Sequence, residues 1–531
     1  YHMGREEKAH LILNRQAMAS HTFVTGSTGT GKSNAVYHLL DEITKDGRTS
    51  FLVVEPAKGE YKNVFGSRAD VKVFGTNPRE TPLLRINPFA FPQDIHILEH
   101  IDRLVEIFSA CWPMYAAMPA VLKDAIERSY QKVGWDLRNS ESEKGVFPTF
   151  FDLLDILPGV IEESHYSKDT QSDYVGALCT RVKSLTNGIY GSVFCAEDAL
   201  SDAELFDCNV VVDLSRVGSM ETKSLLMGIL VMKLQGYRMC GSEMNSRLRH
   251  VTVLEEAHNL LRKTSAEQSQ EGANLQGKSV EMLANAIAEM RTYGEGFIIA
   301  DQAPGLLDMS VIRNTNTKII LRLPDEEDRK LVGKSAALKE AQIDELSKLP
   351  LGVAAVYQNE WPEAVLCKVK AYPVPENAVY HKPSKMPHEI NAEFVFGQLA
   401  AGKELEPLSI SEMEQLKLWL KRHEMMLKPE DGRYLEQVFA GGELDVAKTR
   451  KAVFDFFGGI STVVDYCAAA EKSFTPRKEF LEQLQGQYGL KAAAADWVLN
   501  SVISMGMSLN PDAKAVDNLR TNFEQQGGRV L

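Results

Sequence analysis

One short segment near the N-terminus constrains the fold more than any other part of this chain. Residues 22–25 form an apolar run, a glycine-rich turn follows them, and a helix-favouring stretch begins at about Ser33. The turn has the spacing G-x-x-x-x-G-K-S. Its glycines can adopt positive φ and aim successive backbone N–H groups at phosphate oxygens, and the helix N-terminus adds positive partial charge. This strand–turn–helix pattern predicts a P-loop that binds a nucleoside triphosphate.

The same pattern assigns roles within the site. Lys32 is expected to reach the β- and γ-phosphates and the Ser33 hydroxyl to bind Mg²⁺, so ATP and Mg²⁺ are the predicted ligands. The residues expected to contact the nucleotide are Gly26, Ser27, Thr28, Gly29, Thr30, Gly31, Lys32, Ser33 and Asn34.

Apolar runs that are typical of buried parallel strands recur along the first 370 residues. They lie at 51–55, 71–74, 208–213, 250–255, 296–300, 318–323, 352–358 and 364–369. Helical periodicity appears at 222–238 and 280–293, and in four consecutive segments at 95–112, 119–133, 149–163 and 173–186. We therefore predict an α/β fold, in which a P-loop sheet with a helical insertion is followed by an all-helical C-terminal region.

Shifts in composition give the expected domain boundaries. We predict a nucleotide-binding core at 1–92 and 196–371, a helical insertion at 93–195, a proline-containing linker at 372–389 and a helical C-terminal domain at 390–531. Within the last domain, residues 409–412 form a capping box before a helix at 413–427. The glycine pairs at 441–442 and 458–459 are expected to break later helices.

Composition excludes some classes of protein. No apolar stretch approaches the ~18 residues that a membrane-spanning helix needs, so we expect no integral membrane segment. The seven cysteines are scattered without zinc-site spacing, which favours reduced thiols and a cytoplasmic location. A net charge of −13 argues against a nonspecific nucleic-acid coat but allows a basic lining in a ring pore. Basic residues that could face nucleic acid, or be simply solvated, are Lys58, Lys62, Arg262, Lys263 and Lys278.

A second motif ends the apolar run at 250–255. Glu255 is the last residue of this run and Glu256 follows it, which is typical of a Walker B strand downstream of a P-loop. Adjacent strand residues point to opposite sides, so the two acids should have separate roles. We expect Glu255 to bind Mg²⁺ and Glu256 to orient the attacking water. His258 is either a coupling residue or a structural histidine.

Polar residues after the next strand complete the predicted site. Gln302 follows the run at 296–300 and is a candidate sensor of the γ-phosphate, or a plain turn residue. Arg291 and Arg313 are candidates for an arginine finger that acts on the nucleotide of a neighbouring subunit; the alternative is a solvated arginine.

Together these motifs resemble those of the HerA/FtsK superfamily of P-loop motors, and specifically its HerA-like helicase/translocase branch. The resemblance covers roughly residues 10–370, and the segments that carry it are 26–33, 59–61, 254–258, 291–294, 301–304 and 316–322. Position by position, Lys32 and Ser33 match the Walker A pair and Glu256 the catalytic glutamate. Arg291 matches the arginine of an Arg-x-Tyr-Gly segment, and Gln302 matches a Gln-x-Pro sensor.

The resemblance implies a RecA-like ATPase core that forms a hexameric ring around double-stranded DNA, with ATP sites at the subunit junctions. Related bacterial ATPases often work with a partner nuclease or another effector in DNA processing or anti-phage defence. The chain departs from the family in three respects. Glu255 stands where many members have Asp, only about 25 residues precede the P-loop where members often carry a small β-barrel, and the C-terminal 150 residues match no motif.

Two other functions are compatible with these residues. One is a VirB4-like conjugation or secretion ATPase, and the other is an ATP-gated ring scaffold that activates a partner effector. The segment 255–258 also resembles the DEAH motif of superfamily 2 helicases. Those enzymes need a second RecA-like domain, which the helical region after residue 390 does not supply.

Overall fold

The structure is a computed structural model. It describes residues 10–115, 117–142, 145–196, 199–241, 244–263, 275–374, 379–382, 429–439, 445–472, 475–488, 492–510 and 512–530. The chain divides into two compact units, the first formed by Tyr1–Glu141 with Phe147–Lys382 and the second by Ser142–Val146 with Pro383–Leu531. The predicted capping box at 409–412, the helix at 413–427 and the glycine pair at 441–442 lie outside the described residues.

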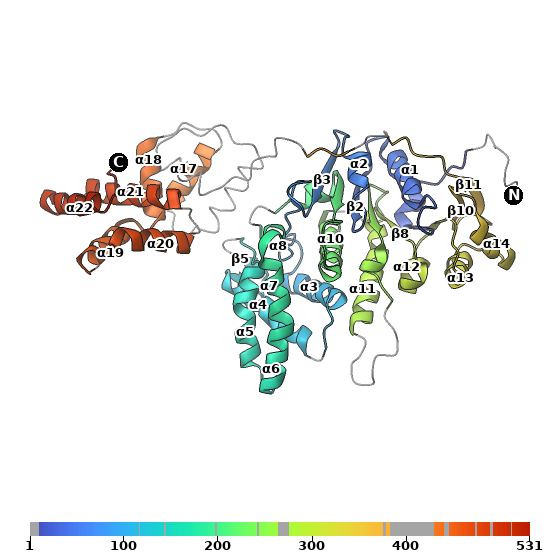
Figure 1. The fold of residues 1–531 in the computed structure, drawn as a ribbon, viewed down its shortest axis with the longest axis horizontal. Coiled ribbons are helices and arrows are strands. Elements are labelled where there is room, and N and C mark those ends of the chain that lie inside the picture. The colour runs from blue at the N-terminus through green and yellow to red at the C-terminus, as the bar shows by residue number, and fades with distance from the viewer. Residues whose placement is uncertain are drawn as a thin grey trace. The chain divides into compact units, whose positions relative to one another are not determined.

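The first unit is built on a nine-stranded, mostly parallel sheet with the order β11-β10-β9-β1-β8-β7-β2-β6-β3 (Figure 1). Seven neighbouring strands, from β9 to β3 in this order, pair in parallel, while β10 near one edge pairs antiparallel with both β9 and β11. Every strand falls on a predicted apolar run, which confirms the α/β fold class. The strands are β1 (Thr22–Thr25), β2 (Ser50–Glu55), β3 (Val71–Gly75), β6 (Asn209–Asp213), β7 (His250–Glu255), β8 (Glu295–Asp301), β9 (Thr317–Ile320), β10 (Val353–Gln358) and β11 (Val365–Lys368).

Helices cover both faces of the sheet because its strands are apolar on both faces. Phe51 and Val53 of β2 pack into one core with residues of α1 (Lys32–Thr44), and the alternate residues Leu52 and Val54 pack into the other. The second core also contains residues of α3 (Ile97–Cys111), α10 (Met220–Gly241) and α11 (Leu275–Glu289). The shorter helices of this unit are α2 (Tyr61–Phe65), α12 (Met309–Arg313), α13 (Glu326–Ser335) and α14 (Glu340–Glu345).

A mainly helical segment connects β3 to β6 (cyan to green in Figure 1). After α3 it comprises α4 (Met118–Lys132), the short strands β4 (Trp135–Asp136) and β5 (Glu141–Ser142), α5 (Phe150–Glu163), α6 (Lys168–Tyr174), α7 (Thr180–Thr186), α8 (Gly188–Phe194) and α9 (Asp202–Phe206). The helix predicted at 173–186 begins earlier and is interrupted by a π-helical turn at Val175–Cys179. Apolar periodicity does not distinguish a π turn from an α-helical one, because both keep the chain helical.

The second unit contains helices around a core of its own. They are α17 (Pro429–Phe439), α18 (Val446–Phe456), α19 (Gly459–Lys472), α20 (Pro476–Tyr488), α21 (Ala492–Leu509) and α22 (Ala513–Gln525). Buried Phe456, Tyr466 and Ile503 belong to this core. Gly458 and Gly459 both have positive φ and lie where α18 ends and α19 begins, so the break predicted there is confirmed.

None of the described helices has both the length and the apolarity to cross a bilayer by itself. One bent pair, Ala447–Phe456 with Gly459–Ala470, meets both criteria when its two helices are taken together.

A buried ion-pair network fastens α10 to the amino ends of β7 and β8. Glu295 is fully buried, and its carboxylate receives Arg238 Nε at 2.9 Å, His250 Nδ1 at 2.7 Å and the Thr252 hydroxyl at 2.8 Å. Burial acts to raise the pKa of Glu295, but His250 and Arg238 outweigh it and the pKa lies below its usual value. The carboxylate therefore depends on these partners to remain charged.

Replacing Arg238 with Met should leave the Glu295 carboxylate buried without its guanidinium partner. We expect a loss of about 3–5 kcal/mol in the free energy of unfolding, and a first thermal transition lower by roughly 10 °C. The matched control is Lys72→Met, which removes the exposed ion pair of Lys72 with Glu204 and should change the stability by less than about 1 kcal/mol. Equal shifts in the two variants would contradict a structural role of the buried network.

Candidate active site at the carboxyl edge of the sheet

The parallel register brings the predicted motifs to one edge of the sheet. Thr25, the last residue of β1 before the P-loop, is paired with Asp301 of β8. Glu255, the last residue of β7, is paired with Ala300 of the same strand. The P-loop, the two glutamates and the segment that contains Gln302 therefore leave the sheet side by side.

The P-loop has the geometry of a phosphate cradle. Gly29 and Gly31 have φ of 77° and 104°, which glycine adopts without strain. A Cβ added to Gly26 would lie 2.8 Å from Cβ of Leu321, so the close approach of the loop to the sheet requires glycine there. Helix α1 begins at Lys32, with its N-terminus opening on the loop. The loop therefore fits a polyphosphate.

Several of the predicted nucleotide contacts have side chains that bond to other residues of the chain, Thr30 and Asn34 among them. The Thr30 hydroxyl donates to the Ser27 carbonyl at 2.7 Å within the loop. The Asn34 amide donates to the Lys370 carbonyl at 2.8 Å and accepts from the Tyr372 backbone N–H at 2.7 Å. The Asn34 side chain thus fastens the segment after β11 to the first turn of α1.

Lys32 and Glu256 form an ion pair across the site. Lys32 Nζ lies 3.3 Å from Glu256 Oε1, and the two side chains are 10% and 14% exposed. Glu256 has φ 46° and ψ 52°, a left-handed conformation that is uncommon outside glycine. A triphosphate bound in the loop would compete with Glu256 for the Lys32 ammonium group.

Glu255 lies deeper than Glu256 and is held by a tyrosine. The Tyr61 hydroxyl donates to Glu255 Oε1 at 2.5 Å, and both residues are buried. Burial raises the pKa of Glu255. Tyr61 occupies one carboxylate oxygen, and Mg²⁺ prefers oxygen ligands such as the remaining carboxylate oxygen and the Ser33 hydroxyl. This donor set fits the predicted Mg²⁺ ion.

Two further acids at this edge were not recognised as site residues in the sequence. Glu55 ends β2 and accepts the backbone N–H groups of Glu60 at 2.8 Å and Tyr61 at 3.0 Å. Burial raises the pKa of Glu55 to about 7. Asp213 ends β6 and pairs with Lys62 at 2.6 Å. The sequence does contain a signal for both acids, because each is the last residue of an apolar run.

The same ion pair changes the interpretation of Lys62. Its ammonium group also lies 3.0 Å from Glu80 and its side chain is 12% exposed, so Lys62 is committed within the chain. The proposed exposure of Lys62 to nucleic acid is therefore wrong in this structure. Lys58, Arg262, Lys263 and Lys278 are exposed.

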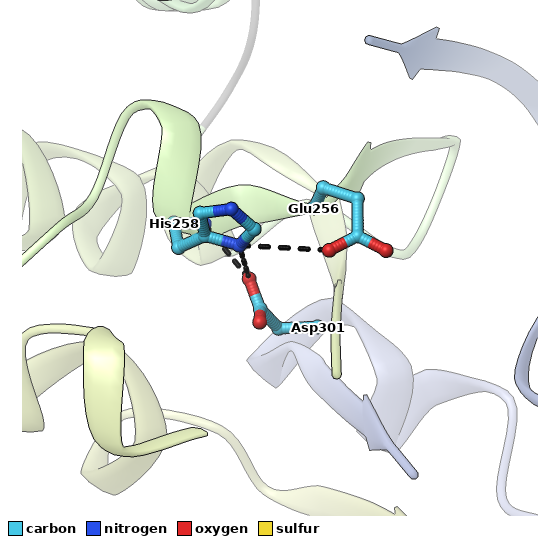
Figure 2. A group of neighbouring side chains, drawn as sticks. All are labelled: Glu256, His258 and Asp301. Carbon is cyan, nitrogen blue, oxygen red and sulfur yellow. Dashed lines mark hydrogen bonds and ion pairs between the residues drawn. The ribbon is translucent and has the colours of Figure 1, made fainter. Parts of the chain in front are cut away.

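His258 joins the turn after β7 to the end of β8 (Figure 2). Its Nδ1 lies 2.9 Å from Asp301 Oδ2 and 3.5 Å from Glu256 Oε2. The hydrogen bond with Asp301 raises the pKa of His258. The three ligand atoms of Glu256, His258 and Asp301 lie within 4.8 Å of one another, close enough to share a proton or a metal ion.

The Gln302 side chain lies beside the P-loop. The Thr28 hydroxyl donates to Gln302 Oε1 at 2.8 Å, which places the amide beside the loop that would hold the phosphates.

Arg291 and Arg313 lie at the opposite edge of the sheet. Arg291 precedes the amino end of β8, and Arg313 ends α12, just before the amino end of β9. Both line one polar cavity of about 540 Å³, together with Asn285, Glu289 and Asn316. The structure therefore does not bring the two arginines to the P-loop of their own chain.

Comparisons with known proteins show what this chain is similar to. Residues 2–187 match the family described as helicase HerA, central domain. The DNA double-strand break repair helicase HerA of Sulfolobus acidocaldarius is 24% identical over 370 residues, which cover 67% of this chain and 66% of that protein. The probable helicase MJECL08 of Methanocaldococcus jannaschii is 23% identical over 386 residues, or 68% of each chain. These matches support membership of the HerA/FtsK-type superfamily of P-loop ATPases.

A solved structure supports the fold of this ATPase. VirB4 of Thermoanaerobacter pseudethanolicus superposes with a TM-score of 0.51 at 19% identity, covering 66% of this chain and 90% of that one. The predicted RecA-like architecture is therefore confirmed.

Replacing Tyr61 with Phe tests whether its hydrogen bond positions Glu255 to bind Mg²⁺. Losing a hydrogen bond to a charged group should raise the Mg²⁺ concentration needed for half-maximal hydrolysis by about tenfold. The measurement is a Mg²⁺ titration of the steady-state ATPase rate. Tyr130→Phe is the control, because Tyr130 is also buried but donates to the Phe89 carbonyl in the helical segment. An unchanged Mg²⁺ requirement in Tyr61→Phe would contradict the predicted binding of Mg²⁺ by a Glu255 carboxylate that Tyr61 positions.

Proposed function

We propose that this ATPase is a DNA translocase that hydrolyses ATP with Mg²⁺ and works as a hexameric ring around double-stranded DNA. The observation that carries the proposal is the division of the predicted site between two edges of one sheet. Lys32, Glu256 and Gln302 gather at the carboxyl edge, while Arg291 and Arg313 line a cavity at the amino edge. One chain thus holds both halves of a site that a ring would assemble at each subunit junction.

Each side chain at the carboxyl edge has a role in this proposal. Lys32 binds the β- and γ-phosphates, and Ser33 and Glu255 hold Mg²⁺, which when bound neutralises phosphate charge. Glu256, released from Lys32, orients the attacking water, and Gln302 contacts the γ-phosphate. The ion pair at 3.3 Å supports this exchange because it holds Glu256 within reach of the phosphate-binding lysine.

The position of the arginines supports action between subunits. An arginine finger must reach the transferred phosphoryl group, and neither Arg291 nor Arg313 lies at the edge where its own P-loop ends. A head-to-tail contact that places the amino edge of one subunit against the carboxyl edge of the next gives a ring when its rotation closes.

The names of the relatives bear on the biological setting. The names of the two relatives describe helicases, one of them in DNA double-strand break repair, which supports DNA as the partner. We propose a cytoplasmic motor that works with a partner nuclease or another effector in DNA processing or anti-phage defence. The second unit has a hydrophobic core of its own.

Complementation between inactive variants tests the shared site. Arg291→Ala and Glu256→Gln should each abolish most ATP hydrolysis, but co-expressed mixed rings should recover up to about a quarter of the wild-type rate. Recovery is expected because some junctions then combine an intact Glu256 with an intact Arg291. The same experiment with Arg313→Ala identifies which arginine acts, and Arg48→Ala, at an exposed arginine, is the control. No recovery with either arginine would contradict a site shared between subunits.

Stimulation by DNA separates the motor from an ATP-gated scaffold. We expect duplex DNA to raise the ATPase rate several-fold, and Glu256→Gln to lower the stimulated rate by about 100-fold or more. The measurement is steady-state phosphate release with and without a duplex. Hydrolysis that is indifferent to DNA would contradict the translocase and favour the scaffold.

A further inference from the structure

We propose that Asp301 and His258 form a positioning pair. The pair couples the position of the Glu256 side chain to the contact between Gln302 and the P-loop. This inference rests on the proposed roles of Glu256 and Gln302 and adds two residues that act through them.

The backbone at Glu256 needs such support. A residue other than glycine in the left-handed region is strained, and the strain persists only where surrounding contacts hold it. The Glu256 carbonyl accepts the backbone N–H of Asn259 at 2.9 Å and its side-chain amide at 2.7 Å. The backbone N–H of His258 donates to Asp301 Oδ2 at 2.8 Å. The turn that aims Glu256 is thus fastened to β8.

One buried carboxylate joins the two turns that follow β7 and β8. Asp301 is fully buried. Its Oδ2 accepts both the backbone N–H and the Nδ1–H of His258, and its Oδ1 accepts the backbone N–H of Ala303 at 2.9 Å. Gln302 lies between Asp301 and Ala303. A movement of Gln302 is therefore transmitted to Asp301, the residue that accepts the hydrogen bonds of His258.

Glu256 lies between Lys32 and His258 at the end of this path. Its Oε1 faces Lys32 Nζ at 3.3 Å. Its Oε2 faces His258 Nδ1 at 3.5 Å (Figure 2). Glu256 Oε2 is buried and has no hydrogen-bond partner of its own. When a triphosphate draws Lys32 away, His258 is the side chain that still lies beside the carboxylate. The path of contacts is continuous and runs through Thr28, Gln302, Asp301, His258, Glu256 and Lys32.

A pair of near-isosteric variants distinguishes positioning from bulk structure. His258→Asn keeps a donor at about the place of Nδ1, whereas His258→Gln moves the donor toward the place of Nε2. In the full chain we expect kcat for ATP to fall at least tenfold in His258→Gln and His258→Ala, and to recover most of its value in His258→Asn. The affinity for a fluorescent ATP analogue should stay within about threefold in all three, since these residues are placed outside the phosphate contacts.

His38→Ala is the matched control. His38 lies on α1, and its Nε2 contacts the Lys370 carbonyl at 2.9 Å, so this variant removes one histidine contact near the site without touching the pair. We expect its kcat to be unchanged. Equal kcat in His258→Asn and His258→Gln, or a parallel loss of kcat and nucleotide affinity, would overturn the positioning pair.

A double-mutant cycle tests the tie to Gln302. If His258 acts on the same path as Gln302, the variant that combines His258→Ala with Gln302→Ala should lose about as much kcat as the worse single variant. Losses that multiply would overturn the coupling. Glu256→Gln separates this outcome from failure of the proposed function. An active Glu256→Gln enzyme contradicts the role of Glu256, whereas an inactive Glu256→Gln beside a fully active His258→Ala contradicts only the positioning pair.

Discussion

The parallel pairing of β1, β8 and β7 is the constraint on which the rest of the site depends. Carboxyl ends of parallel strands meet at one edge, so the register of Thr25 with Asp301 and of Glu255 with Ala300 places three loops side by side. A slip of one residue would turn Glu255 to the other face of the sheet. The buried apolar residues on both faces fix this register, and the polar chemistry follows from it.

That edge concentrates negative charge, and the fold compensates it locally. Glu55, Asp213, Glu255 and Asp301 end four strands, and each is less than a tenth exposed. Their compensation comes from backbone N–H groups, from a tyrosine hydroxyl, from Lys62 and from His258. Glu256 differs because it is paired with Lys32, the residue that a phosphate group would also attract. The site therefore combines fixed acids with one acid whose partner can be exchanged.

The sequence predicted those parts of this arrangement that depend on local pattern. Apolar runs located the nine strands of the main sheet, and the P-loop, Glu255, Glu256 and Gln302 were identified because each lies at or just after the end of such a run. Contacts between distant segments could not be predicted in this way. The bond from Tyr61 to Glu255 joins residues 194 positions apart, and the Asn34 side chain meets a segment 336 positions away. Nothing in the local sequence around Lys62 indicates Asp213 as its partner.

In the proposed ring, one subunit supplies the P-loop and its neighbour supplies the arginine. The most direct measurement is a cryo-EM structure of the full chain with Mg²⁺, ADP, aluminium fluoride and duplex DNA. The account predicts a closed ring in which Arg291 or Arg313 lies about 3 Å from the fluoride held by the adjacent subunit. A monomer, or an assembly in which both arginines point away from every nucleotide, would contradict it.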